Sequence, residues 1–95
     1  MRFAAVIEYI QDKAKIAEVR PTHRQYLASL KEKGQLAASG PFTDDYGALI
    51  IYEAASREEA EAFLKGDPFH QAGVFVQWTI RPWNPVIANR ELFPA

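Results

Sequence analysis

The sequence predicts an α+β fold, and three observations support this prediction. Four apolar stretches rich in β-branched and aromatic residues alternate with two segments of helical periodicity. The turn-rich segment TDDYG, residues 43–47, separates the second stretch from the third, which favours an antiparallel hairpin. Ser56 and Glu59 form a capping box in front of the second helical segment. The resulting β-α-β-β-α-β order is that of the ferredoxin-like fold, an antiparallel sheet with two helices on one face.

The first strand is predicted over residues 2–9, RFAAVIEY, and a long helical segment follows it. Ile16, Val19, His23, Leu27 and Leu30 form one apolar stripe of this helix, with the histidine as its exception. Pro21 removes a helical hydrogen bond, so we expect a kink or a restart there, with Pro21 in the first turn of the new helix. Gly34 is expected to end it.

The second and third strands are predicted over 35–42 and 47–54. The second helix should run from its cap at Ser56 to Gly66, with Ala60, Phe63 and Leu64 on its buried side. The last strand follows over 74–83, VFVQWTIRPW.

A homodimer is expected from the distribution of apolar residues. In the strands at 2–9 and 47–54, apolar residues occupy both the odd and the even positions. The side chains of these two sets point to opposite faces, so the sheet face without helices should also be apolar. Face-to-face pairing of two sheets would bury that face. We divide the chain into a domain of residues 1–83 and a C-terminal extension of residues 84–95, whose apolar residues favour an arm over the partner.

Composition excludes several classes of protein. A net charge of −1, without a lysine or arginine cluster, argues against a nucleic acid or an anionic membrane as partner. The N-terminal apolar run is too short for a membrane span or a signal peptide. With no cysteine there is no disulfide or thiolate chemistry, and a cytoplasmic location fits. Two histidines in no metal-ligand spacing predict no metal site, and no cofactor is expected.

His23 and Asp67 are the candidate catalytic residues. If the second helix continued past Gly66, Asp67 would lie on its sheet-facing side, as His23 does on the first helix. Asp67 before Pro68 is equally typical of the cap of a short new helix, and a capping carboxylate keeps lone pairs for an imidazole. A buried histidine that only satisfies a polar partner remains the structural alternative.

Other residues are candidates for binding a small-molecule substrate. Arg20 could hold an anionic group, and Gly40, beside Ser39, allows close approach of a ligand to the backbone. Phe69 and His70 follow Asp67 and complete the set. Tyr9, Phe42 and Trp78 could form apolar walls with Phe69. Each of these residues also has an ordinary structural explanation as a surface, turn or core residue.

The motifs together resemble the YciI-like (YCII-related) family over residues 1 to about 83. They are R-P-x-H at Arg20 to His23, G-x-L-x-x-S-G-P at Gly34 to Pro41, D-P-F at Asp67 to Phe69, A-G at Ala72 and Gly73, and P-W at Pro82 and Trp83. The resemblance implies a dimeric α+β barrel whose cleft holds a histidine and an aspartate, here His23 and Asp67. The compact acidic TDDYG tip and the C-terminal extension depart from the family pattern at the pocket mouth.

Three functional hypotheses follow, and the sequence leaves the choice among them open. The first is a small enzyme, a lyase or isomerase, in which His23 moves a proton and Asp67 orients its ring. Elimination, isomerisation or tautomerisation of a small metabolite, for example one derived from an aromatic compound, would use such a pair. The alternative is a non-catalytic small-molecule-binding or accessory dimer, and a dimer with a purely structural His23–Asp67 pair is a third reading.

Overall fold

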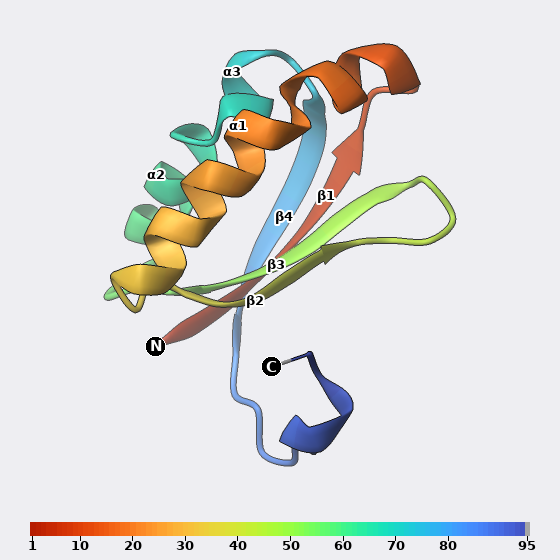
Figure 1. The fold of residues 1–95 in the computed structure, drawn as a ribbon. Coiled ribbons are helices and arrows are strands. Elements are labelled where there is room, and N and C mark those ends of the chain that lie inside the picture. The colour runs from red at the N-terminus through yellow and green to blue at the C-terminus, as the bar shows by residue number, and fades with distance from the viewer. Residues whose placement is uncertain (95) are drawn as a thin grey trace.

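One antiparallel sheet with helices on a single face forms the protein in its computed structural model, which describes residues 1–94 (Figure 1). The strands lie in the order β2-β3-β1-β4. The predicted ferredoxin-like fold is therefore confirmed for the protomer. Its elements are β1 (Arg2–Tyr9), α1 (Lys13–Glu32), β2 (Leu36–Pro41), β3 (Gly47–Glu53), α2 (Arg57–Lys65), α3 (Pro68–Gln71), β4 (Phe75–Trp83) and a 3₁₀ turn, η1 (Arg90–Leu92).

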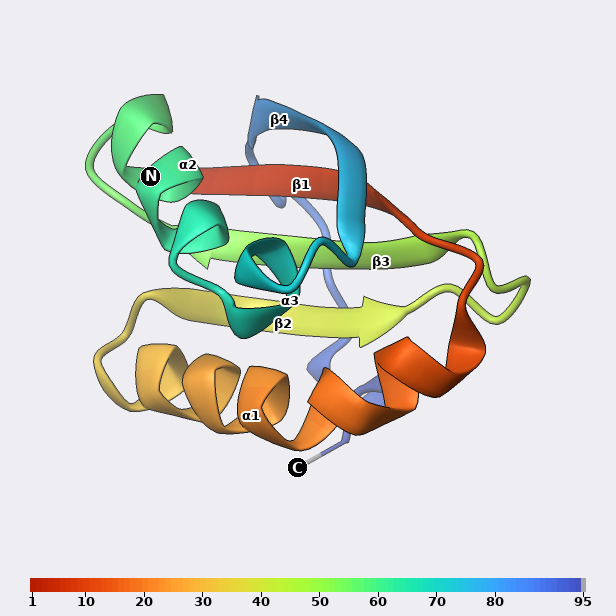
Figure 2. The ribbon, with the colours of Figure 1, turned by 90° about the horizontal axis from the view of Figure 1, so that it is seen from above.

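The core lies between the sheet and the helices. Strand β1 alternates, and Phe3, Ala5, Ile7 and Tyr9 are buried on the helix side. The opposite face carries the cross-strand pair Val6 and Leu49, which are 40% and 36% exposed. Helices α1, α2 and α3 all lie on the other side of the sheet (Figures 1 and 2). We call the face of Val6 and Leu49 the open face.

Helix α1 passes through Pro21 as one continuous element, so of the two expectations, a kink or a restart, the restart is wrong. Pro21 lacks the N–H that would bond to the carbonyl four residues earlier, yet Ile16, Leu27 and Leu30 on either side are buried in the core. Packing of this stripe outweighs the local cost. The helix ends as predicted at Gly34, whose φ of 73° is typical of the residue that follows a helix.

The hairpin between β2 and β3 is tight and closely packed against β1. The Phe42 N–H donates to the Gly47 carbonyl at 2.8 Å, and Asp45 adopts a left-handed φ of 67° in the turn. A Cβ at Gly47 would lie 1.8 Å from the Ile7 carbonyl oxygen, so only glycine fits there. This contact holds the hairpin tip near the end of β1.

The second helix begins as its capping box predicts. The Glu59 N–H donates to the Ser56 hydroxyl at 3.1 Å, and Gly66 ends the helix. The Glu59 carboxylate accepts from the Ala55 N–H, whereas a capping box has it accept from the N–H of the cap residue itself, Ser56. No helix in residues 1–94 combines the length and the apolar character needed to cross a bilayer.

Residues 84–94 lie on the side of the sheet away from the helices (Figures 1 and 2). Val86, Ile87, Leu92 and Phe93 in this segment are exposed. The expected arm over a partner subunit therefore stays a prediction. Ala95 lies outside the described residues.

Candidate functional site

His23 and Asp67 form a buried pair between α1 and the start of α3. The Nδ1 atom of His23 lies 2.7 Å from Oδ1 and 2.9 Å from Oδ2 of Asp67. The two residues are 7% and 0% exposed. The structure thus brings together the two residues that the sequence singled out.

Asp67 reaches this position because α2 stops one residue earlier. Helix α2 does not continue to Asp67 as the first of our two expectations required; it ends at Gly66, and Asp67 caps α3 with Pro68 in the first helical position. The Phe69 N–H donates to Asp67 Oδ1 at 2.9 Å. One carboxylate therefore caps a helix and accepts from an imidazole at the same time.

Aromatic packing fixes the plane of the His23 ring. The ring stacks on Phe69 with centroids 3.9 Å apart and planes inclined by 13°. Phe75 lies edge-on to the same imidazole at 6.4 Å. Among the described residues Nε2 has no hydrogen-bond partner, because the Asp67 contacts use only Nδ1.

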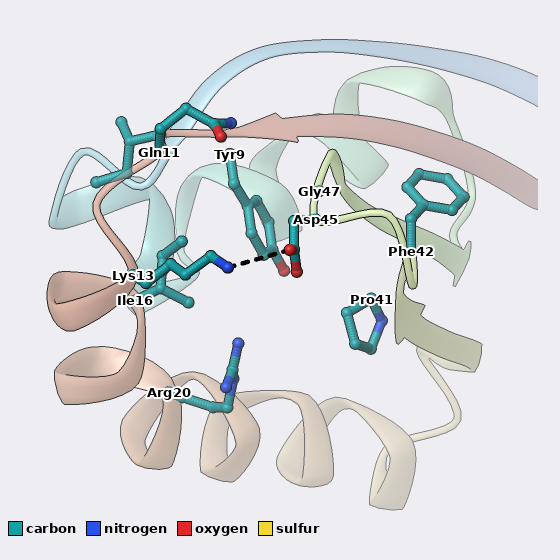
Figure 3. A pocket seen from close by; sticks show the side chains of 10 residues that line it. Tyr9, Gln11, Lys13, Ile16, Arg20, Pro41, Phe42, Asp45 and Gly47 are labelled. Carbon is teal, nitrogen blue, oxygen red and sulfur yellow. Dashed lines mark ion pairs between the residues drawn. The ribbon is translucent and has the colours of Figure 1, made fainter.

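Two adjoining cavities lie beside this pair. The histidine cavity, about 140 Å³, is lined by Tyr9, Arg20, His23, Arg24, Leu27, Ser39, Gly40, Pro41, Ala48, Ile50 and Phe69. The hairpin cavity, about 180 Å³, is lined by Tyr9, Ile10, Gln11, Lys13, Ile16, Arg20, Pro41, Phe42, Asp45 and Gly47 (Figure 3). Tyr9, Arg20 and Pro41 line both, so a ligand in one cavity would touch the walls of the other.

Four of the five predicted binding residues, namely Arg20, Ser39, Gly40 and Phe69, line the histidine cavity. His70 does not; it lies edge-on to Trp78 with ring centroids 5.3 Å apart, and neither residue lines either cavity. Tyr9 and Phe42 do form cavity walls, as the sequence predicted.

Arg24 is the residue that sequence reasoning missed. It lies four positions after Arg20, the spacing that places two side chains on the same side of a helix, so this signal was available. Within residues 1–94, neither arginine forms an ion pair with a carboxylate. Two guanidinium groups beside an imidazole make the histidine cavity suitable for an anionic group.

The hydroxyl of Tyr9 has an altered acidity. Burial raises the pKa of Tyr9 to about 12, and the negative charge of Asp67 acts in the same direction, while Arg20 and Arg24 oppose both. The phenol is therefore protonated throughout the neutral range. It can donate a hydrogen bond there.

The part of the chain that the structure describes contains no group of three or more histidine, cysteine, aspartate or glutamate side chains placed to hold a metal ion. The polar side chains around the histidine cavity are those of His23, Tyr9, Ser39, Arg20 and Arg24.

Comparisons with known proteins agree with the fold and the motifs. Residues 1–84 match the YCII-related domain. Protein YciI of Escherichia coli O6:H1 and Protein YciI of Shigella flexneri are each 35% identical over 92 residues, covering 82% of this chain and 94% of theirs. A solved structure of 5-chloro-2-hydroxyhydroquinone dehydrochlorinase from Burkholderia phenoliruptrix AC1100, in complex with 2,5-dihydroxybenzoquinone, superimposes with a TM-score of 0.77. It is 28% identical, and the match covers 88% of this chain and 94% of that one.

Proposed function

Because this chain belongs to the YCII-related domain family, we propose that its histidine cavity is an active site in which His23 transfers a proton to or from a small-molecule substrate. One observation carries this proposal. A fully buried carboxylate holds Nδ1 of an imidazole at hydrogen-bond distance, while the same imidazole lines a cavity. Such a pair is the usual arrangement of an oriented general base.

Asp67 sets the tautomer of His23 in this proposal. A carboxylate accepts hydrogen bonds, so the neutral ring carries its proton on Nδ1 and leaves a lone pair on Nε2. Nε2 then takes a proton from the substrate. Elimination, isomerisation and tautomerisation share this first step.

We propose a single oxygenated six-membered ring as the substrate class. An apolar cavity of about 150 Å³ accepts benzene, so the histidine cavity, at about 140 Å³, has room for one ring. Ser39 and the two unpaired arginines suit the oxygens of such a ring. The dehydrochlorinase to which the chain is similar acts on a chlorinated hydroxyhydroquinone, and its structure holds a dihydroxybenzoquinone.

The test uses two compounds. Binding of 2,5-dihydroxybenzoquinone is followed by its visible absorption, and turnover of 5-chloro-2-hydroxyhydroquinone by release of chloride. We expect binding and turnover in the wild type, and loss of turnover by at least about 100-fold in His23→Ala. His70→Ala is the matched control, since this histidine lies outside both cavities. Equal rates in the two variants would exclude His23 as the base.

A non-catalytic binding module is the second candidate, and the arginines favour it. Arg20 and Arg24 would bind an anion whether or not His23 reacts. Tight binding of the quinone without chloride release or proton exchange would select this alternative.

We also propose that two copies pair through the open face, with residues 84–94 laid over the partner. Val6 and Leu49 form an exposed cross-strand apolar pair on this face, and Trp83 on β4 is 48% exposed. Leu49→Lys should yield a monomer in sedimentation velocity, whereas Gln71→Lys, at an exposed position of α3, should not. A wild-type monomer at micromolar concentration would overturn the pairing.

The cysteine-free composition is compatible with a cytoplasmic location.

A further inference from the structure

Tyr9 occupies the boundary between the two cavities. It is the last residue of β1, and its ring packs on Phe69 at 5.3 Å and on Phe75 at 5.8 Å. Phe69 also supports the His23 ring, so the phenol and the imidazole share one aromatic support. In Figure 3 the phenolic oxygen lies at the end of the ring away from β1, toward Arg20 and Asp45. Its position relative to His23 is therefore fixed by packing.

The Tyr9 hydroxyl has a free donor, unlike the hydroxyl of Tyr26. Tyr26 donates to the Phe63 carbonyl at 2.7 Å, whereas the Tyr9 hydroxyl makes no hydrogen bond with the protein among the described residues. Tyr52 also has an unpartnered hydroxyl, but it is fully buried and lines neither cavity. Tyr9 is thus the tyrosine whose unpaired O–H can meet a ligand.

Two guanidinium groups line the same cavity as this hydroxyl, and their positive charges oppose the negative charge of Asp67. Arg20 and Arg24 line the same cavity, and their charges lower the pKa of Tyr9 while burial and Asp67 raise it to about 12. The phenol stays protonated, so its O–H can donate a hydrogen bond at neutral pH. A substrate oxyanion at this point would meet one O–H donor and two guanidinium groups.

We propose that Tyr9 is a catalytic residue of this cavity, donating a hydrogen bond to the substrate oxygen that becomes negative when His23 removes a proton from the neighbouring carbon. Nε2 of His23 takes the proton, and the C–H electron pair forms a carbon–carbon double bond. The carbonyl π pair moves onto the oxygen, where Tyr9 and the two arginines stabilise the charge, and Tyr9 keeps its own proton. In a chlorinated substrate the oxygen then re-forms the carbonyl, the carbon–carbon double bond shifts by one position, and chloride leaves from the next carbon with the C–Cl electron pair. This inference rests on the proposed function. It narrows the substrate to a carbonyl compound with an acidic C–H beside the carbonyl, such as the keto form of a hydroxylated ring.

The test compares Tyr9→Phe with Tyr46→Phe. Phenylalanine preserves the contacts of the Tyr9 ring with Phe69 and Phe75, and Tyr46 is an exposed tyrosine of the hairpin that lines neither cavity. The probe is 2,5-dihydroxybenzoquinone, whose hydroxyls are vinylogous acids and present ionised oxygens in neutral solution. Melting temperatures of both variants establish that the fold is intact.

We expect Tyr9→Phe to bind the quinone at least about tenfold more weakly than wild type and to release chloride from 5-chloro-2-hydroxyhydroquinone about 100-fold more slowly. Tyr46→Phe should match wild type in both measurements. Unchanged binding and rate in Tyr9→Phe, with activity still lost in His23→Ala, would overturn the role of Tyr9 and leave the proposed function standing. A wild-type protein that neither binds nor converts these compounds would overturn both.

Discussion

Asp12 and Asp67 both cap a helix, but only Asp67 is buried against an imidazole. Asp12 precedes α1, accepts from the Lys15 N–H at 3.1 Å and is exposed. Asp67 precedes α3, accepts from the Phe69 N–H at 2.9 Å and is fully buried against His23. The difference is the passage of α1 over the start of α3, which removes one carboxylate from water and brings an imidazole to it. The same local motif therefore acquires its role from tertiary packing.

Removing each carboxylate in turn should give the largest difference between the two caps, measured as loss of unfolding free energy. Asp67→Ala takes away a cap and one partner of a buried pair, so we expect a loss of about 3 kcal/mol of unfolding free energy. Asp12→Ala should cost about 1 kcal/mol, the usual value of a cap. Urea denaturation of both variants measures the difference. Equal losses would mean that the His23–Asp67 contact adds nothing to stability.

Replacing the residue that contacts each carboxylate, His23 for Asp67 and Lys15 for Asp12, also tests how the two caps differ in their contribution to stability. By sequence, leucine at position 23 continues the apolar stripe and should be neutral or stabilising, but the fully buried Asp67 revises this expectation. We now expect His23→Leu to lose about 2 kcal/mol, because a buried carboxylate is left without the imidazole.

Lys15→Leu is the matched change at the other cap. It should have little effect, since Asp12 binds the backbone of residue 15 and not its side chain. Thermal melting of both variants near neutral pH is the measurement. A neutral His23→Leu would contradict the pairing as a stabilising contact.

The charge of Asp67 should also affect how steeply the stability of the protein falls at alkaline pH. The pKa of Tyr9 is about 12 in the folded chain against 10.0 ordinarily, so between these values the unfolded state binds fewer protons than the folded state. Stability must then fall as pH rises from 10 to 12, with this tyrosine contributing up to about 1.4 kcal/mol per pH unit. The fall should be shallower in Tyr9→Phe and in Asp67→Asn, and unchanged in Asp12→Asn. In melting curves at pH 9 to 11, an Asp67→Asn slope equal to that of wild type would show that Asp67 does not act on Tyr9, and an unchanged slope in Tyr9→Phe would show that Tyr9 does not contribute.

The smallest effect is expected near the Asp12 cap, at the mouth of the hairpin cavity. Lys13 and Asp45 form an ion pair of 3.2 Å whose side chains are 78% and 68% exposed. Asp45→Asn should change the unfolding free energy by less than about 0.5 kcal/mol, because water and salt screen such a pair. A loss above about 1 kcal/mol in 0.15 M salt would mean that this contact anchors the hairpin.

The sequence was informative wherever a short motif decides a local conformation. The hairpin at residues 43–47, the cap at Ser56 and the end of α1 at Gly34 are all set by turn and cap chemistry. The restart expected at Pro21 did not occur. That expectation rested on the low helix propensity of proline alone, and the packing of the α1 stripe holds the helix together.

The candidate site could be predicted in its parts but not in its shape. The stripe position of His23 and the D-P-F sequence after Gly66 pointed to the pair. The extent of the two cavities depends on how α1 lies over the sheet, so the unpaired hydroxyl of Tyr9 emerged only from the fold, whereas the spacing of Arg24 from Arg20 was a signal that the sequence already held. The orientation of His70 toward Trp78 was equally beyond a local pattern.

The central claim is that Asp67 holds the proton of the neutral His23 ring on Nδ1 and leaves Nε2 as the base in the histidine cavity. NMR of ¹⁵N-labelled histidine, followed through a pH titration until the ring is neutral, observes the two nitrogens separately. We predict a protonated Nδ1 and a bare Nε2 in the wild type, and loss of this preference in Asp67→Ala. A neutral ring that carries its proton on Nε2 in the wild type would contradict the account.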